Sequence, residues 1–210
     1  DDYLVKPFVK EVLINRIAKL LRRKGELAEI DHAIEQGQLD WASRLVDREI
    51  KRQPANTYDL LKLKAELAIR LNRHAQAKTL YEQILAQRPI LWARLGLAKV
   101  NLLLGEYATA REQFQALVDE NYYYIEAYDG LVEALEHEDA LEEAQAILAQ
   151  AVTISPTSPK RQLKMACLAE ANQDVETASK AMRAAVRFGK HSVYRDVESH
   201  LRLAQLQNEQ

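Results

Sequence analysis

The sequence predicts an all-α protein built from helix pairs in tandem. Only six glycines and five prolines occur among 210 residues, which is too few for the frequent turns of an all-β fold. Alanine, leucine, glutamate, glutamine, lysine and arginine dominate the composition, and all six favour helices. Alanine also recurs every 33–35 positions, which indicates a repeated structural unit. The recurring residues are Ala42, Ala77, Ala110, Ala144 and Ala178.

Each of these alanines occupies the same place in a longer pattern. Five residues before it stands a residue that we expect to form a tight turn; these are Gly37, Asn72, Gly105, Asp139 and Gln173. Four residues after it comes a larger apolar residue; these are Val46, Tyr81, Phe114, Leu148 and Met182. The small alanine lets two antiparallel helices approach closely, and the larger residue fills the gap to the next pair. Because no single pair buries its apolar face alone, the pairs must stack on one another.

The pattern resembles the tetratricopeptide repeat (TPR), most clearly at residues 93–110 and 128–156. The resemblance covers roughly residues 23–192 and implies a right-handed α-solenoid of about five helix–turn–helix units. The expected units span residues 23–56, 58–90, 91–124, 125–158 and 159–192. Residues 193–210 predict a capping helix or the first half of a sixth repeat. The alternative is an unrelated α-solenoid or helix bundle.

Residues 1–24 do not follow the repeat. A short β-prone run ends in Lys6-Pro7-Phe8, and the apolar spacing from Val9 to Lys24 predicts a helix that ends at Gly25. This arrangement resembles the carboxyl end of a response-regulator receiver domain, with the end of its last strand, its Lys-Pro corner and its last helix. The alternative is a chance Lys-Pro turn before an amphipathic helix.

The receiver resemblance implies roles for two residues. In that family the lysine at the place of Lys6 contacts the phosphorylated aspartate, and the aromatic residue at the place of Tyr3 changes rotamer on phosphorylation. That aspartate would precede residue 1, so we expect Lys6 to take no part in phosphotransfer within this chain. The chain also begins without methionine. We therefore expect a piece of a longer bacterial two-component response regulator, with TPR repeats as its output region.

The sequence gives no sign of an enzyme. It has no His-Glu-x-x-His, Gly-x-Ser-x-Gly or glycine-rich phosphate loop, and its five histidines are scattered. We therefore expect no catalytic residue, no metal site and no cofactor. The single cysteine, Cys167, excludes an intrachain disulfide, and we expect it to be a small packed hydrophobic residue. No apolar run reaches the ~20 residues of a membrane helix, so we expect a cytoplasmic protein that avoids membranes.

We expect the function to be binding of another protein or peptide. In TPR proteins the first helix of each pair lines a concave surface, and the resemblance implies which positions face it. The candidate partner-binding residues are Lys62, Glu66, Arg70, Trp92, Lys99, Asp129, Glu133 and Glu136. The equivalent positions of the fifth unit include Lys160, Leu163, Lys164 and Cys167. Trp92 could anchor a peptide or pack between repeats, and both interpretations stay open.

Residues 112–159 contain eleven Asp or Glu and no Lys or Arg. An acidic wall in this part of the surface would favour a basic partner. A solvated acidic surface is the preferred interpretation.

Gly96 and Gly130 share one repeat position inside predicted helices, where each costs about 1 kcal/mol relative to alanine. Close packing of a neighbouring helix is the preferred explanation for both. The other explanation is the close approach of a ligand backbone.

Two further functions stay open from the sequence. A net charge of −2 argues against general attraction to nucleic acid, but Arg22-Arg23-Lys24 forms a local basic cluster that would bind phosphates weakly. Without interleaved aromatic residues or a groove-reading motif, nucleic-acid binding is the weaker expectation. A solenoid that lacks a polar cap could also associate with copies of itself.

Overall fold

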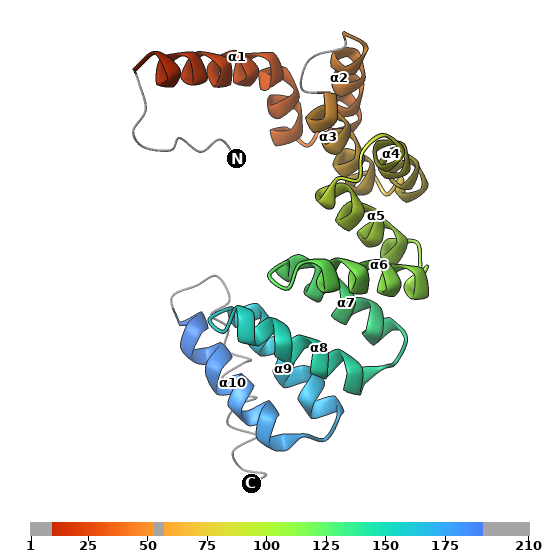
Figure 1. The fold of residues 1–210 in the computed structure, drawn as a ribbon, viewed down its shortest axis with the longest axis vertical. Coiled ribbons are helices and arrows are strands. Elements are labelled where there is room, and N and C mark those ends of the chain that lie inside the picture. Colours follow the sequence, from red (N-terminus) through yellow and green to blue (C-terminus); the bar gives the residue numbers. More distant parts are fainter. Residues whose placement is uncertain (1–9, 53–56, 191–210) are drawn as a thin grey trace. The chain divides into compact units, whose positions relative to one another are not determined.

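The computed structural model describes residues 10–52 and 57–190 (Figure 1). Within these two ranges the chain forms ten α-helices and no strand, which confirms the all-α prediction. The helices are α1 (Lys10–Glu35), α2 (Leu39–Lys51), α3 (Thr57–Arg70), α4 (His74–Gln87), α5 (Leu91–Leu103), α6 (Tyr107–Glu120), α7 (Ile125–His137), α8 (Leu141–Ile154), α9 (Pro159–Ala171) and α10 (Val175–Gly189). None of them has the length and apolar character needed to cross a bilayer.

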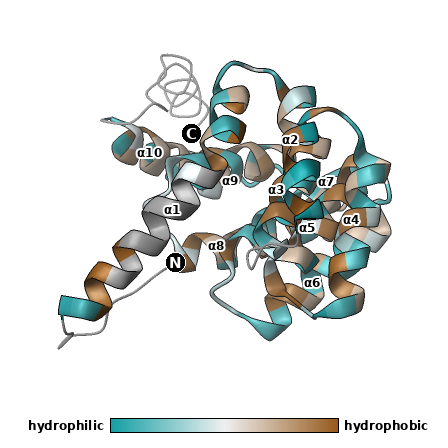
Figure 2. Ribbon diagram, turned by 90° about the horizontal axis from the view of Figure 1, so that it is seen from above, coloured by the Kyte–Doolittle hydropathy of each residue, from teal (hydrophilic) through white to brown (hydrophobic). Residues whose placement is uncertain are grey.

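The helices follow one another in pairs, and three residues separate the two helices of each pair. The pairs are the second half of α1 with α2, then α3 with α4, α5 with α6, α7 with α8, and α9 with α10. Figure 2 shows hydrophobic and hydrophilic segments alternating along the helices, as expected for helices with one apolar and one polar side. The predicted helix–turn–helix repeats are confirmed.

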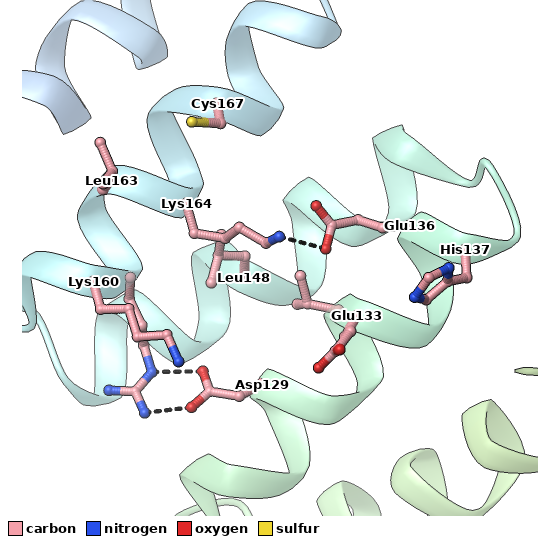
Figure 3. Close-up of a pocket in the computed structure, with 11 residues that line it drawn as sticks. Asp129, Glu133, Glu136, His137, Leu148, Lys160, Leu163, Lys164 and Cys167 are labelled. Carbon is pink, nitrogen blue, oxygen red and sulfur yellow. Dashed lines mark hydrogen bonds and ion pairs between the residues drawn. The ribbon is translucent and has the colours of Figure 1, made fainter. Parts of the chain in front are cut away.

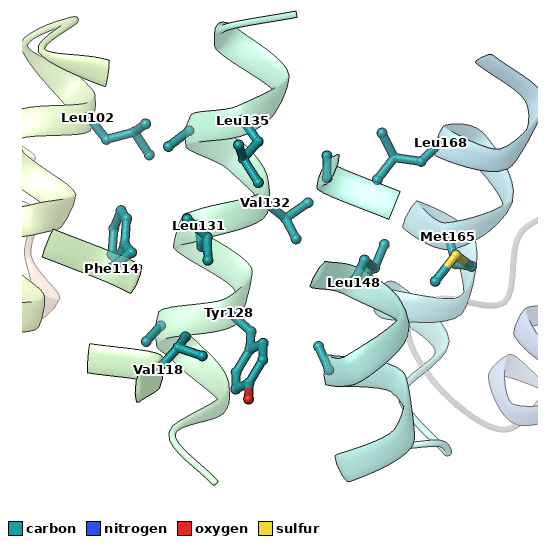
Figure 4. Packing of buried hydrophobic residues seen from close by; sticks show 14 of the residues in the cluster. Leu102, Phe114, Val118, Tyr128, Leu131, Val132, Leu135, Leu148, Met165 and Leu168 are labelled. Carbon is teal, nitrogen blue, oxygen red and sulfur yellow. The ribbon is translucent and has the colours of Figure 1, made fainter. Parts of the chain in front are cut away.

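The chain divides into two compact units, Asp1–Leu80 and Tyr81–Gln210, with the boundary inside α4. The core of the first unit is formed by Ile30, Ala33, Ala42, Leu45, Val46, Leu60 and Leu67. The core of the second unit includes Phe114, Tyr128, Leu131, Leu135, Leu148 and Met165 (Figure 4). The repeated alanines Ala110, Ala144 and Ala178 are all fully buried in this second core.

The five predicted turn residues all adopt the same left-handed backbone conformation. Their φ angles are 71° at Gly37, 57° at Asn72, 79° at Gly105, 60° at Asp139 and 61° at Gln173. At every turn the N–H of this residue donates to the carbonyl three residues back, and the next N–H donates to the carbonyl five residues back. This pair of hydrogen bonds closes the carboxyl end of a helix and satisfies its last carbonyls. The turn positions predicted from the repeat are therefore confirmed.

Gly96 and Gly130 each lie against an aromatic ring from the preceding helix. A Cβ atom built on Gly96 would overlap the ring of Tyr81, and one built on Gly130 would overlap the ring of Phe114. Tyr81 is 4% exposed and Phe114 is 0% exposed, so both rings are held inside the protein. Helix–helix packing, the preferred explanation, therefore accounts for both glycines.

The predicted end of the first helix at Gly25 is wrong, because α1 continues through Gly25 to Glu35. A glycine inside a helix costs only about 1 kcal/mol, which does not by itself stop a helix. The left-handed turn that closes α1 comes at Gly37 instead. As a result, the helix expected from residues 9–24 and the first helix of the first repeat are one continuous element.

Several expectations fall outside the described residues. They concern Tyr3, the Lys6-Pro7-Phe8 corner, and the capping helix expected within residues 193–210. The side chains of Arg22, Arg23 and Lys24 also lie outside the description, although α1 includes their backbone.

Candidate functional site

A groove of about 750 Å³ lies between α7 and α9 in the second unit (Figure 3). Its walls come from these two helices, and α8 contributes one residue to its floor. The lining residues are Asp129, Val132, Glu133, Glu136, His137, Leu148, Lys160, Arg161, Leu163, Lys164 and Cys167.

Helical periodicity explains why these residues meet. The lining residues of α7 lie at 129, 132, 133, 136 and 137, and those of α9 include 160, 163, 164 and 167. Residues three and four positions apart share one face of a helix. α7 and α9 are the first helices of two consecutive pairs, so these two faces lie opposite one another across the groove.

A two-pronged ion pair joins the two walls at one end of the groove. Arg161 donates from Nε to Oδ1 of Asp129 at 2.8 Å and from Nη2 to Oδ2 at 2.7 Å. The Arg161 side chain is 16% exposed, and its Nη1 also donates to Oγ of Ser155 at 3.3 Å. Such paired, charge-assisted hydrogen bonds fix geometry as well as adding stability.

A second ion pair crosses the groove further along. Nζ of Lys164 lies 2.7 Å from Oε2 of Glu136. Lys164 follows Glu136 by 28 residues, and Arg161 follows Asp129 by 32 residues, so in both pairs the cation comes from the next repeat.

The groove is therefore not the acidic wall that was one interpretation of residues 112–159. Three acidic residues on α7 face three basic residues on α9, and two of the three on each side are paired with each other. Other carboxylates of that stretch are also neutralised by earlier helices: Arg94 pairs with Glu120, and Arg111 pairs with Glu138 and Glu143. Hydrogen bonding to Arg94 lowers the pKa of Glu120.

The floor of the groove is apolar. Val132 and Leu148 are buried there, Leu163 is half-buried, and Cys167 is exposed. The expectation that Cys167 is packed away is wrong, because its place on α9, one turn after Leu163 and Lys164, turns it to the groove (Figure 3).

The groove lies at the junction that follows two junctions with an aromatic–glycine contact, Tyr81 with Gly96 and Phe114 with Gly130. Leu148 and Lys164 stand 34 residues after Phe114 and Gly130, so they occupy the same two repeat positions. A leucine replaces the ring, and a lysine replaces the glycine. The side chain of that lysine reaches to Glu136 on α7.

The other predicted binding residues of the second unit lie outside the groove. Trp92 is half-buried on α5, and its ring meets Tyr81 edge-on, with 6.5 Å between ring centroids and 66° between planes. This contact favours packing between repeats over a free peptide anchor. Lys99 is exposed on α5.

Three predicted binding residues belong to the first unit. Lys62, Glu66 and Arg70 are all exposed on α3, one helical turn apart. Nζ of Lys62 lies 3.9 Å from Oε1 of Glu66. None of the three lines the groove.

Val132, Leu148 and Arg161 line the groove but were not among the positions expected to face the concave surface. Arg161 could have been found from the sequence, because it follows Asp129 by nearly one repeat and lies beside a position expected to face the concave surface. Leu148 and Lys164 replace the ring and the glycine of the preceding junctions, and this difference in the sequence also indicated the groove.

Comparison with known proteins supports the fold. Residues 62–124 match the family model described as tetratricopeptide repeat. The fold is a TPR fold. It is similar to MamA (residues 41 to the end) from Desulfovibrio magneticus RS-1, at 19% identity and a TM-score of 0.67, over 80% of this chain and 94% of that one.

Two further structures described as TPR proteins are similar. TTC0263 from Thermus thermophilus has 17% identity and a TM-score of 0.64, over 88% of this chain and 98% of that one. YrrB, described as a TPR protein with an unusual peptide-binding site, has 16% identity and a TM-score of 0.60, over 90% of this chain and 97% of that one. A sequence search of curated proteins gave no match.

Proposed function

We propose that this chain is a non-catalytic scaffold that binds a peptide segment of another protein in the groove between α7 and α9. The observation that carries the proposal is the groove itself, with its apolar floor and its charged walls. The similarity to YrrB supports it to a limited extent, because that structure is described as having a peptide-binding site on the same fold.

The construction of the groove favours recognition by side chains. Both walls are helices, and the backbone N–H and C=O groups of a helix interior bond to each other. A ligand therefore meets charged side chains on the walls and Leu163 and Cys167 near the floor. Binding sites commonly combine an apolar floor with a few placed polar groups in this way.

Two charged residues of the groove are available for ion pairs with a binding partner. Glu133 on α7 and Lys160 on α9 are both exposed, and neither forms an ion pair with a residue of the described part of the chain. The partner therefore need not be uniformly basic, although a basic group suits Glu133.

Cys167 provides a direct test, because it is the only cysteine of the chain and is exposed in the groove. Peptides selected from a displayed random library against the full chain should slow modification of Cys167 by a thiol reagent. Glu133→Lys should weaken their binding, because it reverses a charge in the groove. Glu142→Lys on α8 is the matched control, since Glu142 is exposed and outside the groove lining.

Selected peptides that bind both variants equally, and leave Cys167 as reactive as before, would place binding elsewhere. Binding of nucleic acid alone, abolished by moderate salt, would favour the nucleic-acid alternative.

The exposed apolar residues of α1 favour a second proposal, in which the chain is the TPR output region of a bacterial, cytoplasmic response regulator. Val12, Ile14 and Ile17 are 44%, 50% and 46% exposed, so no described element covers them. A receiver domain packed on the first half of α1 would cover such residues. Amide exchange in residues 10–24 should then be slower in a longer chain that includes that domain, and equal exchange would contradict the proposal.

A further inference from the structure

We propose that the bound peptide places one large apolar side chain over Leu148, between a basic residue that meets Glu133 and an acidic residue that meets Lys160. This inference rests on the proposed function and specifies the chemistry of its ligand.

Two junctions between helix pairs of the second unit are filled by an aromatic ring packed on a glycine. Between α6 and α7 the ring of Phe114 lies against Gly130, and between α4 and α5 the ring of Tyr81 lies against Gly96. Each ring is almost fully buried, so at these two junctions the chain fills the space with its own aromatic side chain.

The next junction, between α8 and α9, lacks this ring and glycine. Leu148 is smaller than a phenylalanine, and Lys164 directs its side chain toward Glu136 on the opposite wall. The groove opens at this junction, with Val132, Leu163 and Cys167 beside Leu148. An apolar side chain of a ligand would move out of water and pack against Leu163 and Cys167, which are the accessible apolar residues beside the buried Leu148. This contact is favourable because it buries apolar surface.

The charged residues of the groove walls are only partly paired with each other. Asp129 forms an ion pair with Arg161, and Glu136 forms one with Lys164. These four residues therefore need no charged partner from the ligand. Glu133 and Lys160 lie on opposite walls, and no described residue pairs with either (Figure 3). A peptide with opposite charges on the two sides of its apolar residue would pair with both, and charge complementarity of this kind also selects its orientation.

The decisive variant rebuilds the missing ring pair. Leu148→Phe with Lys164→Gly recreates the residues found at Phe114 and Gly130, so the double variant should fold and fill the groove. We expect it to unfold cooperatively and to bind selected peptides at least about tenfold more weakly than the parent. A folded double variant that binds as tightly as the parent would overturn the inference.

A second experiment varies the strongest selected peptide. Replacing its central apolar residue by alanine should weaken binding about tenfold. Exchanging its basic and acidic residues should weaken binding to the parent and strengthen binding to the Glu133→Lys/Lys160→Glu variant, whose charges are exchanged in the same way. Affinities would be measured by fluorescence polarisation with labelled synthetic peptides.

The outcomes separate this inference from the proposed function. Peptides that protect Cys167 but do not depend on a central apolar residue would leave the groove as a binding site and overturn the stated ligand chemistry. A dimer in sedimentation that peptides do not dissociate, with Cys167 protected in it, would instead make a second copy of the chain the occupant and overturn the inference. Failure of every selected peptide to protect Cys167 would overturn the proposed function as well.

Discussion

Arg161 on α9 holds both carboxylate oxygens of Asp129 on α7, at 2.8 Å and 2.7 Å. The two residues are 32 positions apart and belong to consecutive repeats. Because the arginine side chain is 16% exposed and the contact has two prongs, the pair differs from a solvated surface ion pair. It also links the two helices that form the groove.

Removing this pair should lower stability. We expect Arg161→Ala to reduce the free energy of unfolding by about 1–2 kcal/mol, because the Asp129 carboxylate loses two charge-assisted hydrogen bonds. Urea denaturation would measure the change. Arg48→Ala is a matched control, since Arg48 pairs with Glu29 at 2.7 Å while both side chains are about half exposed. An equal loss in both variants would contradict a special role for Arg161.

The left-handed turn residues offer a second prediction. Gln173 has a φ of 61°, a conformation that costs a residue with a side chain roughly 1–2 kcal/mol and costs glycine little. Gln173→Gly should therefore raise the free energy of unfolding by about 0.5–1 kcal/mol, after the entropy of the unfolded glycine is subtracted. Gln173→Ala keeps the strained backbone conformation and should not raise the free energy of unfolding. Asn72→Gly should gain less, because asparagine tolerates this conformation better than glutamine.

The packed glycines give a third prediction, in which the same substitution has opposite effects at two sites. Gly130→Ala should destabilise the protein by about 1–2 kcal/mol, because its new methyl group would overlap the ring of Phe114. Gly25→Ala should stabilise it by up to about 1 kcal/mol, because nothing lies within 4 Å of a Cβ built there and alanine favours helices. Thermal unfolding of both variants would show whether the two stability changes have opposite signs.

Adding Phe114→Leu to Gly130→Ala gives a control for this mechanism. If the ring causes the loss, the double variant should lose less free energy of unfolding than the two single variants lose together. Strict additivity would mean that Gly130→Ala acts through something other than Phe114.

A fourth prediction concerns pH. Hydrogen bonds from the side chain and backbone N–H of Thr177 lower the pKa of Asp174, and Gln145 adds to the effect. A lowered folded-state pKa means that the stabilisation is present above the unfolded value of about 3.9 and is lost as the pH falls through the folded value. Asp174→Asn should therefore be less stable than the parent at neutral pH, and the difference should shrink as the pH falls below the unfolded value of about 3.9.

Denaturation curves at a series of pH values would follow this difference. Asp139→Asn is a suitable comparison, because Asp139 is exposed in a turn one repeat earlier and does not cap a helix. A difference between the parent and Asp174→Asn that stays constant across the acid range would refute the assignment.

Much of the fold follows from local patterns in the sequence. The spacing of alanines, apolar residues and turn residues predicts helix pairs, and all five predicted turns have positive φ angles. The end of α1 could not be predicted in the same way, because a single glycine carries too small a cost to decide where a helix stops. There the turn at Gly37 decides the boundary.

The candidate site was harder to predict, because it depends on contacts between repeats. The acidic run of residues 112–159 looks uncompensated along the sequence, yet its partners Arg161 and Lys164 lie on the next first helix. The aromatic–glycine contacts also cross from one pair to the next, so the meaning of Leu148 emerges only when equivalent junctions are compared.

The contacts between the aromatic rings and the glycines also imply that repeats cannot be deleted or reordered without a change in packing. Deleting residues 130–163 would remove one repeat length and bring Lys164 directly after Asp129, opposite the ring of Phe114. A Cβ atom at that place overlaps the ring, so the shortened chain would have a clash at its new junction. Although the repeats have nearly the same length and the same turn, the repeats joined by a ring–glycine contact are matched to their own neighbours, and their order along the chain is part of what the sequence encodes.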